Sequence, residues 1–166
     1  KVSSVAEEHR FIKAPAIVFD DQYELLDAFK EGRLHQDFIA VIRFQGPRAK
    51  GMPELHKLNP TLTVLQKLGY KVGLVTDGRM SGASGKVPSA IHCVPEATEG
   101  GLLAKLKDGD PLLLDCNQGL LKCLNESEVQ ARTAVNTPPM ATGTGRELFN
   151  NIRALLTSSD TGATIF

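Results

Sequence analysis

The 166-residue sequence lacks several features that mark specialised classes of protein. No apolar run approaches the roughly 20 residues that a helix needs to span a bilayer, and residues 1–10 contain no apolar stretch of a secretory signal. Neither sign of charge is in excess, because 19 Lys and Arg residues are matched by 19 Asp and Glu residues. Nucleic-acid binders usually carry a basic excess that neutralises phosphates. We therefore expect a cytoplasmic protein that binds neither membranes nor nucleic acid.

Cysteine is scarce and is not spaced for metal binding. Cys93, Cys116 and Cys123 are odd in number, and no pair has the short separation of a zinc or iron–sulfur ligand set. An unpaired cysteine behaves as a small hydrophobic residue. The sequence therefore predicts three buried free thiols rather than cluster ligands.

Length and composition are those of one ordinary globular domain. The chain is 42% apolar and 23% charged, and a chain of this length can bury roughly two-thirds of its unfolded surface. We therefore treat residues 1–166 as a single domain. The first residue is Lys rather than Met, so we expect a fragment or a processed product of a longer protein.

Hydrophobic patterns in the first half predict a βαβ arrangement. Strand-like runs at 16–19, 38–44 and 71–76 alternate with helical patterns that end near Gly32 and Gly69. Residues 45–53 contain two Gly and two Pro and predict a loop without regular structure.

The second half predicts shorter elements. Residues 89–94 read as an apolar strand with His92 as a core histidine, and turn residues between 112–116 and 120–124 predict a β-hairpin. A helix is predicted from Thr144 to Leu156, with Glu147 in the position of a capping box. Together the elements indicate an α/β domain with a mixed sheet.

The loop at 76–85, with the sequence TDGRMSGASG, follows a predicted strand. In open α/β sheets, ligands collect at the carboxyl ends of strands, and three glycines would let the backbone approach one closely. Ser81 would be presented with little steric cover and could act as a nucleophile or base. The spacing matches neither a phosphate-binding loop, a dinucleotide fingerprint nor a nucleophile elbow. A plain glycine-rich turn is the alternative.

The earlier loop, at 43–57, places one carboxylate among several cations. Glu54 could give an oxygen ligand to Mg²⁺, which needs few protein carboxylates. Arg43, Arg48, Lys57 and Lys86 could clamp carboxylate or phosphate oxygens. The alternatives are a solvated glutamate at a helix start and ordinary surface charges. A metal role for His56 or His92 is a minority interpretation.

At these loops the sequence resembles the dihydroxy-acid and phosphogluconate dehydratase family. The shared segments are 51–54 (GMPE), 76–82 (TDGRMSG), and 95–96 (PE) followed by 100–101 (GG). Four further segments resemble the phosphogluconate branch: 45–48 (QGPR), 55–58 (LHKL), 81–88 (SGASGKVP) and 143–149 (GTGRELF). The resemblance extends over the whole chain, so it describes one domain of a larger enzyme.

The resemblance implies a C-terminal domain of the swivelling β/β/α type, a compact barrel-like mixed sheet with flanking helices. Its implied reaction removes water from 6-phospho-D-gluconate to give 2-dehydro-3-deoxy-6-phospho-D-gluconate, in the Entner–Doudoroff pathway. It further implies Mg²⁺ and an iron–sulfur cluster, expected to be [4Fe–4S], whose cysteines lie in a first domain. That N-terminal domain would be a partner, and we expect a homodimer when the protein is intact. The fragment alone is expected to be inactive.

Site residues follow from the same motifs. Ser81 resembles the base that takes the C2 proton, and it would have to act as an alkoxide beside a cation. Glu54 resembles the carboxylate that this domain lends to Mg²⁺. Because they lie in the shared motifs, the resemblance implies contacts with the substrate carboxylate or phosphate for Arg79, Lys86, His56 and Lys57. One departure is Lys50, where the family pattern has Asn; an extra cation there would either change substrate affinity or point harmlessly outward.

Two other functions stay open at this point. A non-catalytic module could use the cationic loop to dock an anionic ligand or a neighbouring subunit. Dehydration of dihydroxy acids or unphosphorylated sugar acids is chemically close to the reaction above.

Overall fold

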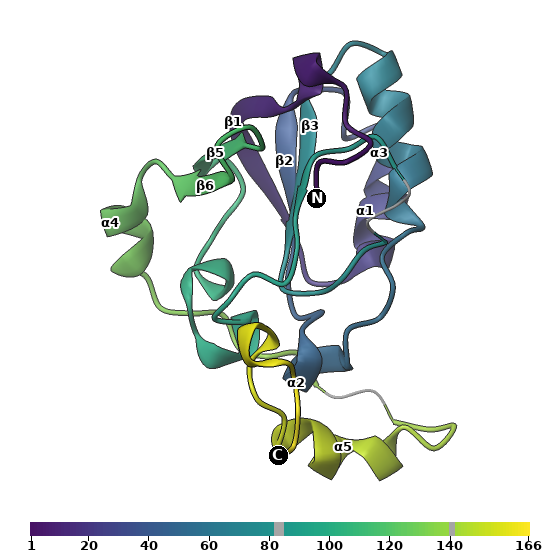
Figure 1. The fold of residues 1–166 in the computed structure, drawn as a ribbon, viewed down its shortest axis with the longest axis vertical. Helices are drawn as coiled ribbons and strands as arrows, with labels where there is room; N and C mark the ends of the chain where they lie inside the picture. The colour runs from purple at the N-terminus through teal and green to yellow at the C-terminus, as the bar shows by residue number, and fades with distance from the viewer. Residues whose placement is uncertain (82–84, 140–141) are drawn as a thin grey trace.

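A curled, six-stranded mixed sheet forms the centre of the domain, in the order β4-β3-β2-β1-β5-β6. The structure, a computed structural model, describes residues 1–81, 85–139 and 142–166. Helices flank the sheet, and α2 and α5 lie together at the lower end of the view in Figure 1. The predicted α/β fold with a barrel-like mixed sheet and flanking helices is confirmed.

Four neighbouring strands are parallel, and a hairpin extends the sheet in the opposite direction. The parallel strands are β1 (Phe11–Phe19), β2 (Phe38–Ile42), β3 (Val72–Thr76) and β4 (Ser89–Ala90). β5 (Pro111–Asp115) pairs antiparallel with the first half of β1, and β6 (Leu120–Cys123) pairs antiparallel with β5. The predicted βαβ unit and hairpin are therefore confirmed, although β1 begins earlier than predicted.

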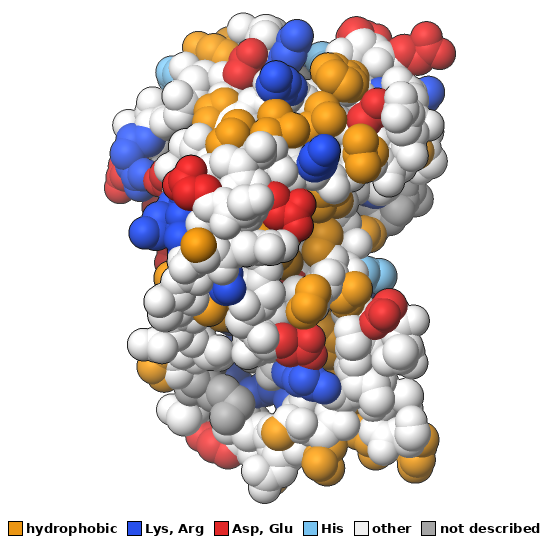
Figure 2. All heavy atoms as spheres, turned by 90° about the vertical axis from the view of Figure 1, so that its left-hand side faces the viewer, with side chains coloured by type: hydrophobic (Ala, Val, Ile, Leu, Met, Phe, Trp, Pro, Cys, Tyr) orange, Lys and Arg blue, Asp and Glu red, His pale blue; other side chains and the backbone are white. Residues whose placement is uncertain are grey.

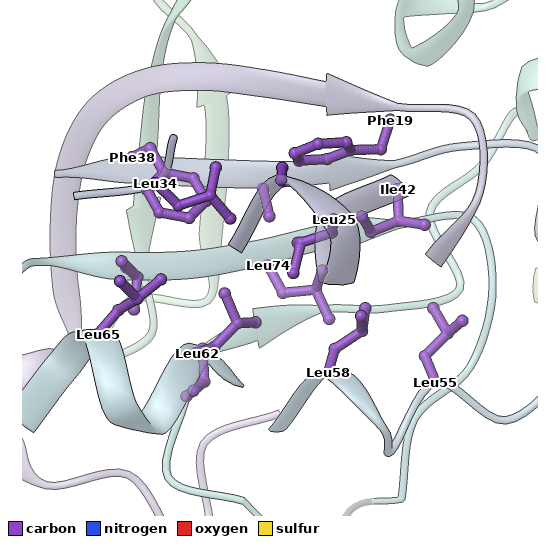
Figure 3. Close-up of a cluster of buried hydrophobic side chains, with 14 of the residues drawn as sticks. Phe19, Leu25, Leu34, Phe38, Ile42, Leu55, Leu58, Leu62, Leu65 and Leu74 are labelled. Carbon is purple, nitrogen blue, oxygen red and sulfur yellow. The ribbon is translucent and has the colours of Figure 1, made fainter. Parts of the chain in front are cut away.

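Two helices cover one face of the sheet. α1 (Gln22–Lys30) and α3 (Leu58–Lys67) present apolar side chains at helical spacing. Figure 3 shows Leu58, Leu62 and Leu65 of α3 pointing toward the strands. Each fully buried leucine contributes about 1.5–3 kcal/mol through its removal from water. The helix pattern in the sequence therefore fixes which face packs inward.

β2 is buried on both faces because a second core lies behind the sheet. Phe38, Ala40 and Ile42 belong to the cluster under the helices, while Ile39 and Val41 join the other one. This alternation follows from the two-residue period of a strand. The second cluster is closed by the hairpin and by residues that follow β4, including Leu103, Leu106 and Val129.

The start of α1 is fixed by its first carboxylate. The Asp21 side chain accepts a hydrogen bond from the backbone N–H of Tyr23 at 2.8 Å, which satisfies one of the free donors at the helix start. This cap places Asp21 and its neighbour Gln22 directly after β1, at the end of the sheet where the loops of interest lie.

The remaining helices are short. They are α2 (Pro47–Lys50), α4 (Glu126–Gln130), α5 (Glu147–Ala154) and the 3₁₀ turns η1 (Glu7–His9), η2 (Ala97–Glu99), η3 (Leu102–Ala104) and η4 (Ser159–Thr161). α2 lies inside the segment predicted to have no regular structure; Pro at its first position sets the helical backbone angle. In the described part of the chain, no helix is long and apolar enough to cross a membrane.

Two predicted details are wrong. His92 is exposed and has a backbone φ of 55°, because the strand ends at Ala90; it is not a core histidine. The last helix begins at Glu147 rather than near Thr144, whose φ of 54° is not helical. Glu147 instead accepts a hydrogen bond from the backbone N–H of Gly143, so the predicted capping box is replaced by a contact with the preceding turn.

The three cysteines are free, as predicted. All three are only half-buried, and they pack against the second core.

Candidate functional site

The carboxyl ends of three parallel strands meet at one edge of the sheet. In the strand register, Phe19 of β1 lies opposite Ile42 of β2, and Ile42 lies opposite Thr76 of β3. The loops that follow these strands therefore start side by side. Edges of this kind are where open α/β sheets bind ligands.

A short parallel bridge joins the two loops that the sequence singled out. Glu54 and Arg79 pair as isolated β-bridge partners, and the Leu55 N–H donates to the Arg79 carbonyl at 3.2 Å. The Glu54 carboxylate accepts a hydrogen bond from the backbone N–H of Ser81 at 2.8 Å. Ser81 and Glu54 are both half-buried. Residues 27 positions apart in sequence thus form one group at the surface.

Arg79 completes this group with a guanidinium. Its Nε donates to the Met52 carbonyl at 2.6 Å, and its Nη1 lies 3.3 Å from the second oxygen of Glu54. The Arg79 side chain is 53% exposed, so the ion pair contributes little stability. Its importance is positional, because it holds a cation beside Glu54 and two residues before Ser81.

A second cation near Glu54 comes from Lys1, which sequence reasoning missed. Its ammonium donates to the carbonyl of Gly85 at 3.1 Å, and its backbone carbonyl accepts from the Ser89 N–H at 3.3 Å. Burial lowers the pKa of Lys1, and the negative charge of Glu54 opposes this shift. Arg79 and Lys1 therefore both lie at the 76–85 loop, Arg79 within it and Lys1 at Gly85. Gly82, Ala83 and Ser84 of this loop lie outside the described residues.

The buried side chain of Asp77 links the 76–85 loop to the 43–57 loop by hydrogen bonds. Its fully buried carboxylate accepts backbone N–H groups of Phe44 at 3.1 Å, Gln45 at 2.9 Å and Ala97 at 2.9 Å. Burial raises the pKa of Asp77, and these hydrogen bonds counteract part of the shift. The residue lay inside the recognised 76–82 motif, but its burial has no signal in the sequence.

Glu96 likewise binds backbone N–H groups, at the start of α2. Its side chain, in a residue that is 2% exposed, accepts the backbone N–H groups of Arg48 at 3.1 Å and Ala49 at 3.2 Å. Burial raises its pKa, and the nearby charge of Asp77 adds to this effect. A Cβ on Gly46 would lie 2.2 Å from the Glu96 carboxylate, so only glycine allows this close approach.

Two of the cations predicted to bind substrate make contacts within the fold. Arg43 is nearly buried; it donates to Asp20 at 2.5 Å and to the Leu106 carbonyl at 3.2 Å. Arg48 donates to the Leu156 carbonyl at 2.7 Å and to Glu99 at 2.6 Å, which ties the C-terminal segment to α2. No described contact joins either guanidinium to Glu54.

The other predicted binding residues are exposed. Lys57 lies 5.4 Å from the ring centroid of Tyr23, and His56 is exposed on the turn between Glu54 and α3. Lys86 lines a separate cavity formed with the N-terminal segment and α3. Lys50, where the family pattern has Asn, pairs with Asp21 and lines another cavity.

The chain offers only part of a metal site. Glu54 provides one partly exposed carboxylate, and the described residues contain no group of three or more His, Cys, Asp or Glu placed to hold a metal ion. One carboxylate fits Mg²⁺ if its other ligands are water, substrate or groups from elsewhere. The cysteines do not fit a cluster; burial raises the pKa of Cys93 to about 11, whereas a ligand must be a thiolate.

The arrangement suits proton removal from an anionic substrate. A half-buried serine lies beside a carboxylate, and two cations stand close enough to that carboxylate to interact with it. Nearby positive charge favours the deprotonated form of an acid and also attracts anions.

Comparisons with known proteins agree on one family. The model of the C-terminal region of dihydroxy-acid/6-phosphogluconate dehydratases matches residues 1–163. Phosphogluconate dehydratase from Pseudomonas aeruginosa is 55% identical over 168 residues, which cover 100% of this chain and 28% of that protein. The Escherichia coli K12 enzyme of the same name is 51% identical, with 99% and 28% covered.

A more distant relative comes from the other branch. The dihydroxy-acid dehydratase from Sulfurisphaera tokodaii is 39% identical over 136 residues, covering 81% of this chain and 24% of that protein. The chain thus spans about a quarter of the length of the relatives it matches.

Proposed function

Because the chain belongs to the dihydroxy-acid/6-phosphogluconate dehydratase family, we propose that it is the C-terminal part of a hydro-lyase acting on 6-phospho-D-gluconate. The observation that carries the proposal is the joined Glu54–Ser81 group at the carboxyl edge of the sheet. Identity also favours this substrate, since the phosphogluconate dehydratases reach 55% and the dihydroxy-acid dehydratase 39%.

In this proposal Ser81 removes the proton from C2 of the sugar acid, and the hydroxyl on C3 leaves as water. A serine hydroxyl is too weak a base at neutral pH, so its deprotonated form needs positive charge nearby. Arg79 pairs with Glu54, and the charge of Lys1 interacts with the same carboxylate. The bond from Ser81 N–H to Glu54 fixes the backbone that carries the base.

Glu54 is the residue of this chain that would hold Mg²⁺, and the bound ion would offset negative charge on the substrate as the C2 proton leaves. The family resemblance also implies a [4Fe–4S] cluster, for which the cysteines here are unsuitable. We propose that its ligands belong to an N-terminal domain, as in the larger relatives of which this chain covers 28%.

The outer face of α5 supports docking of such a domain. Leu148, Phe149, Ile152 and Leu155 are 76, 57, 46 and 71% exposed, and their spacing places them along one side of the helix. The described residues of α5 include no buried one. Exposed apolar stripes of this kind mark interaction surfaces.

Polar substitutions in this stripe test the docking. Leu148→Gln with Leu155→Gln should leave the free energy of unfolding of the 166-residue chain within about 0.5 kcal/mol of wild type, because both side chains are exposed. In the complete protein the same pair should lower the melting temperature and the turnover. An unchanged complete protein would show that the stripe is not covered by the other domain.

Ser81→Ala in the complete enzyme tests the proposed base. Loss of a general base typically costs about a hundredfold or more in rate, so kcat should fall by at least that factor. Ser127→Ala, at an exposed position of α4, is the matched control and should keep wild-type turnover. Circular dichroism must show both variants folded. Turnover of Ser81→Ala within a few-fold of wild type would rule out the serine as base.

A non-catalytic anion-binding or assembly module is the second candidate, supported by the cations around Glu54. Titration of the isolated chain with 6-phosphogluconate and Mg²⁺ separates the two, alongside a size measurement. Tight binding without the other domain would favour the module, whereas neither binding nor activity would fit half of an active site.

Dehydration of dihydroxy acids or unphosphorylated sugar acids is tested on the complete enzyme. It would gain support if the substrate phosphate added nothing to affinity or turnover. We further propose a cytoplasmic homodimer, for which cell fractionation and sedimentation of the complete enzyme are the measurements.

A further inference from the structure

The cavity that Lys50 lines, between α1, α2 and α5, lies beside the Glu54–Ser81 group. Its volume is about 470 Å³, within the roughly 300–1,000 Å³ typical of small-molecule sites. The lining includes Asp21 and Gln22 at the start of α1, Gln45 and Lys50 after β2, and Arg146 and Arg153 around α5. Figure 2 shows a hollow at the lower end of the molecule, where α2 and α5 lie, with Lys or Arg side chains visible inside it.

The lining is positively charged. Lys50, Arg146 and Arg153 contribute three cations, and Asp21 is the one carboxylate among the lining residues, which leaves a formal excess of two positive charges. Asp21 is already paired with Lys50. Guanidinium groups bind phosphate through paired N–H donors and keep their charge at any physiological pH. The cavity is therefore suited to an anion, and to phosphate in particular.

Two residues that line the cavity, Gln45 and Gln22, also carry buried amide oxygens. The Gln45 side chain is fully buried, and its Nε2 donates to the carbonyls of Asp20 at 3.1 Å and Arg43 at 3.0 Å. These two bonds fix the orientation of the amide, and its Oε1 has no hydrogen-bond partner among the described residues. Gln22, which is 7% exposed, likewise has a buried Oε1 without a described partner.

Buried acceptors of this kind call for a donor. Leaving one unsatisfied costs roughly 1–3 kcal/mol, and the hydroxyl groups of a polyol would satisfy it. A phosphate ion alone would serve the cations but offer the amides few donors. The combination of cations and amide oxygens therefore selects a molecule that carries both an anionic group and hydroxyls.

The cavity is also in the right place. Pro53, which lines it, precedes Glu54 directly. Gln45 packs against Gly78, which belongs to the loop that carries Ser81; a Cβ on that glycine would lie 2.6 Å from the Gln45 Cβ. An extended substrate could therefore place one end at Glu54 and Ser81 and its other end in the cavity.

We propose that this cavity binds the phosphate and the neighbouring hydroxyl groups at the distal end of the substrate, an inference that rests on the proposed function. Arg146 and Arg153 hold the phosphate, while the amide oxygens of Gln45 and Gln22 accept hydroxyl hydrogens. The two arginines line the cavity, whereas the apolar residues of α5 are exposed, so phosphate binding and the proposed domain docking use different side chains of one helix.

Neutralisation of each arginine in the complete enzyme tests the proposal. Arg146→Gln and Arg153→Gln should each lower the ratio of kcat/KM for 6-phosphogluconate over gluconate by about tenfold or more, mainly through KM, as expected for lost charge-assisted hydrogen bonds. Inorganic phosphate should lose potency as an inhibitor in parallel. Arg33→Gln is the matched control, because Arg33 is exposed and pairs with Glu31 at the far end of α1. Arg146→Lys should recover part of the ratio.

A binding measurement keeps this proposal separate from the reaction. Calorimetric titration of the complete Ser81→Ala protein with 6-phosphogluconate measures binding with turnover suppressed, and adding Arg146→Gln should weaken the affinity about tenfold or more. Equal affinity with and without Arg146→Gln in folded proteins would overturn the cavity assignment even if the wild-type enzyme dehydrates 6-phosphogluconate. Weakened binding in a protein that never dehydrates it would instead refute the proposed function alone.

Substitution of Gln22 tests the role of the amide oxygen separately from that of the arginines. Gln22→Met keeps the length of the side chain but removes the oxygen, and it should weaken the binding of 6-phosphogluconate more than that of inorganic phosphate. Equal losses for both ligands would show that the amide does not meet a hydroxyl.

Discussion

Replacing Asp77 by Asn removes the buried charge that fastens the two loops of the site. The carboxylate accepts three backbone N–H groups, two at Oδ2 and one at Oδ1. An asparagine can keep the pair from Phe44 and Ala97 on its single oxygen. Its NH₂ group then faces the N–H of Gln45, so one donor loses its acceptor and meets a second donor.

The size of the effect follows from these contacts. A hydrogen bond to a charged group contributes about 1.5–3 kcal/mol, and a buried unsatisfied donor costs about 1–3 kcal/mol. Part of the loss is regained because a neutral amide is cheaper to bury than the ion, in line with the raised pKa of Asp77. We expect the free energy of unfolding to fall by about 2–3 kcal/mol.

Urea denaturation of the 166-residue chain is the assay. With a slope of about 1–3 kcal/mol/M, the midpoint should drop by roughly 0.7–3 M. Asp108→Asn is the control, because exposed Asp108 accepts one backbone N–H, from Val18 at 2.7 Å, which asparagine can retain. If Asp77→Asn shifted the midpoint no more than the control, Asp77 would not be the link between the loops.

Three further predictions concern separate parts of the domain. Gly78→Ala would place a Cβ 2.6 Å from that of Gln45, so we expect a loss of about 1–3 kcal/mol in urea denaturation, and an unchanged midpoint would contradict this packing. Arg132 binds Asp110 at 2.6 and 2.9 Å; burial raises the pKa of Asp110, but the hydrogen bonds from Arg132, Asn125 and Lys107 together with the charge of Arg132 outweigh it and lower the pKa below the ordinary value near 3.8. The associated stability is therefore present above that value and lost as pH falls through the lowered pKa; Arg132→Gln should reduce stability at pH 7 and flatten the acid limb of a pH-dependent denaturation series, and an unchanged acid limb would contradict this. Burial raises the pKa of Cys93 to about 11, so at pH 8 its alkylation by iodoacetamide, followed by mass spectrometry, should be about a hundredfold slower than that of a free thiol, and a rate within tenfold would contradict it.

Local patterns were sufficient for the central elements. The periodicity of Leu62 and Leu65, stopped by Gly69, predicts α3, and the β-branched and aromatic run at 38–44 predicts β2, which ends two residues earlier, at Ile42. The hairpin follows from turn residues between two apolar runs. Such patterns depend on a few neighbouring residues, so they can be interpreted without knowing the contacts made by the rest of the chain.

Local patterns failed where a residue's surroundings come from distant segments. His92 lies in an apolar stretch, but the strand stops two residues earlier and the side chain is exposed. The contacts of Arg43 and Arg48 have no signal in the sequence either, because their partners Asp20, Leu106, Glu99 and Leu156 are brought near only by folding.

The sequence by itself determined the family and the two loops that carry Glu54 and Ser81, because glycine- and proline-rich segments after strands are visible in one dimension. Only the tertiary structure decided that a backbone hydrogen bond joins those loops and that buried Asp77 holds them. It alone placed Gln45 and Arg146 on one cavity. The physical reason is that burial and hydrogen-bond partners depend on strand register and helix packing, which bring together residues about 100 positions apart.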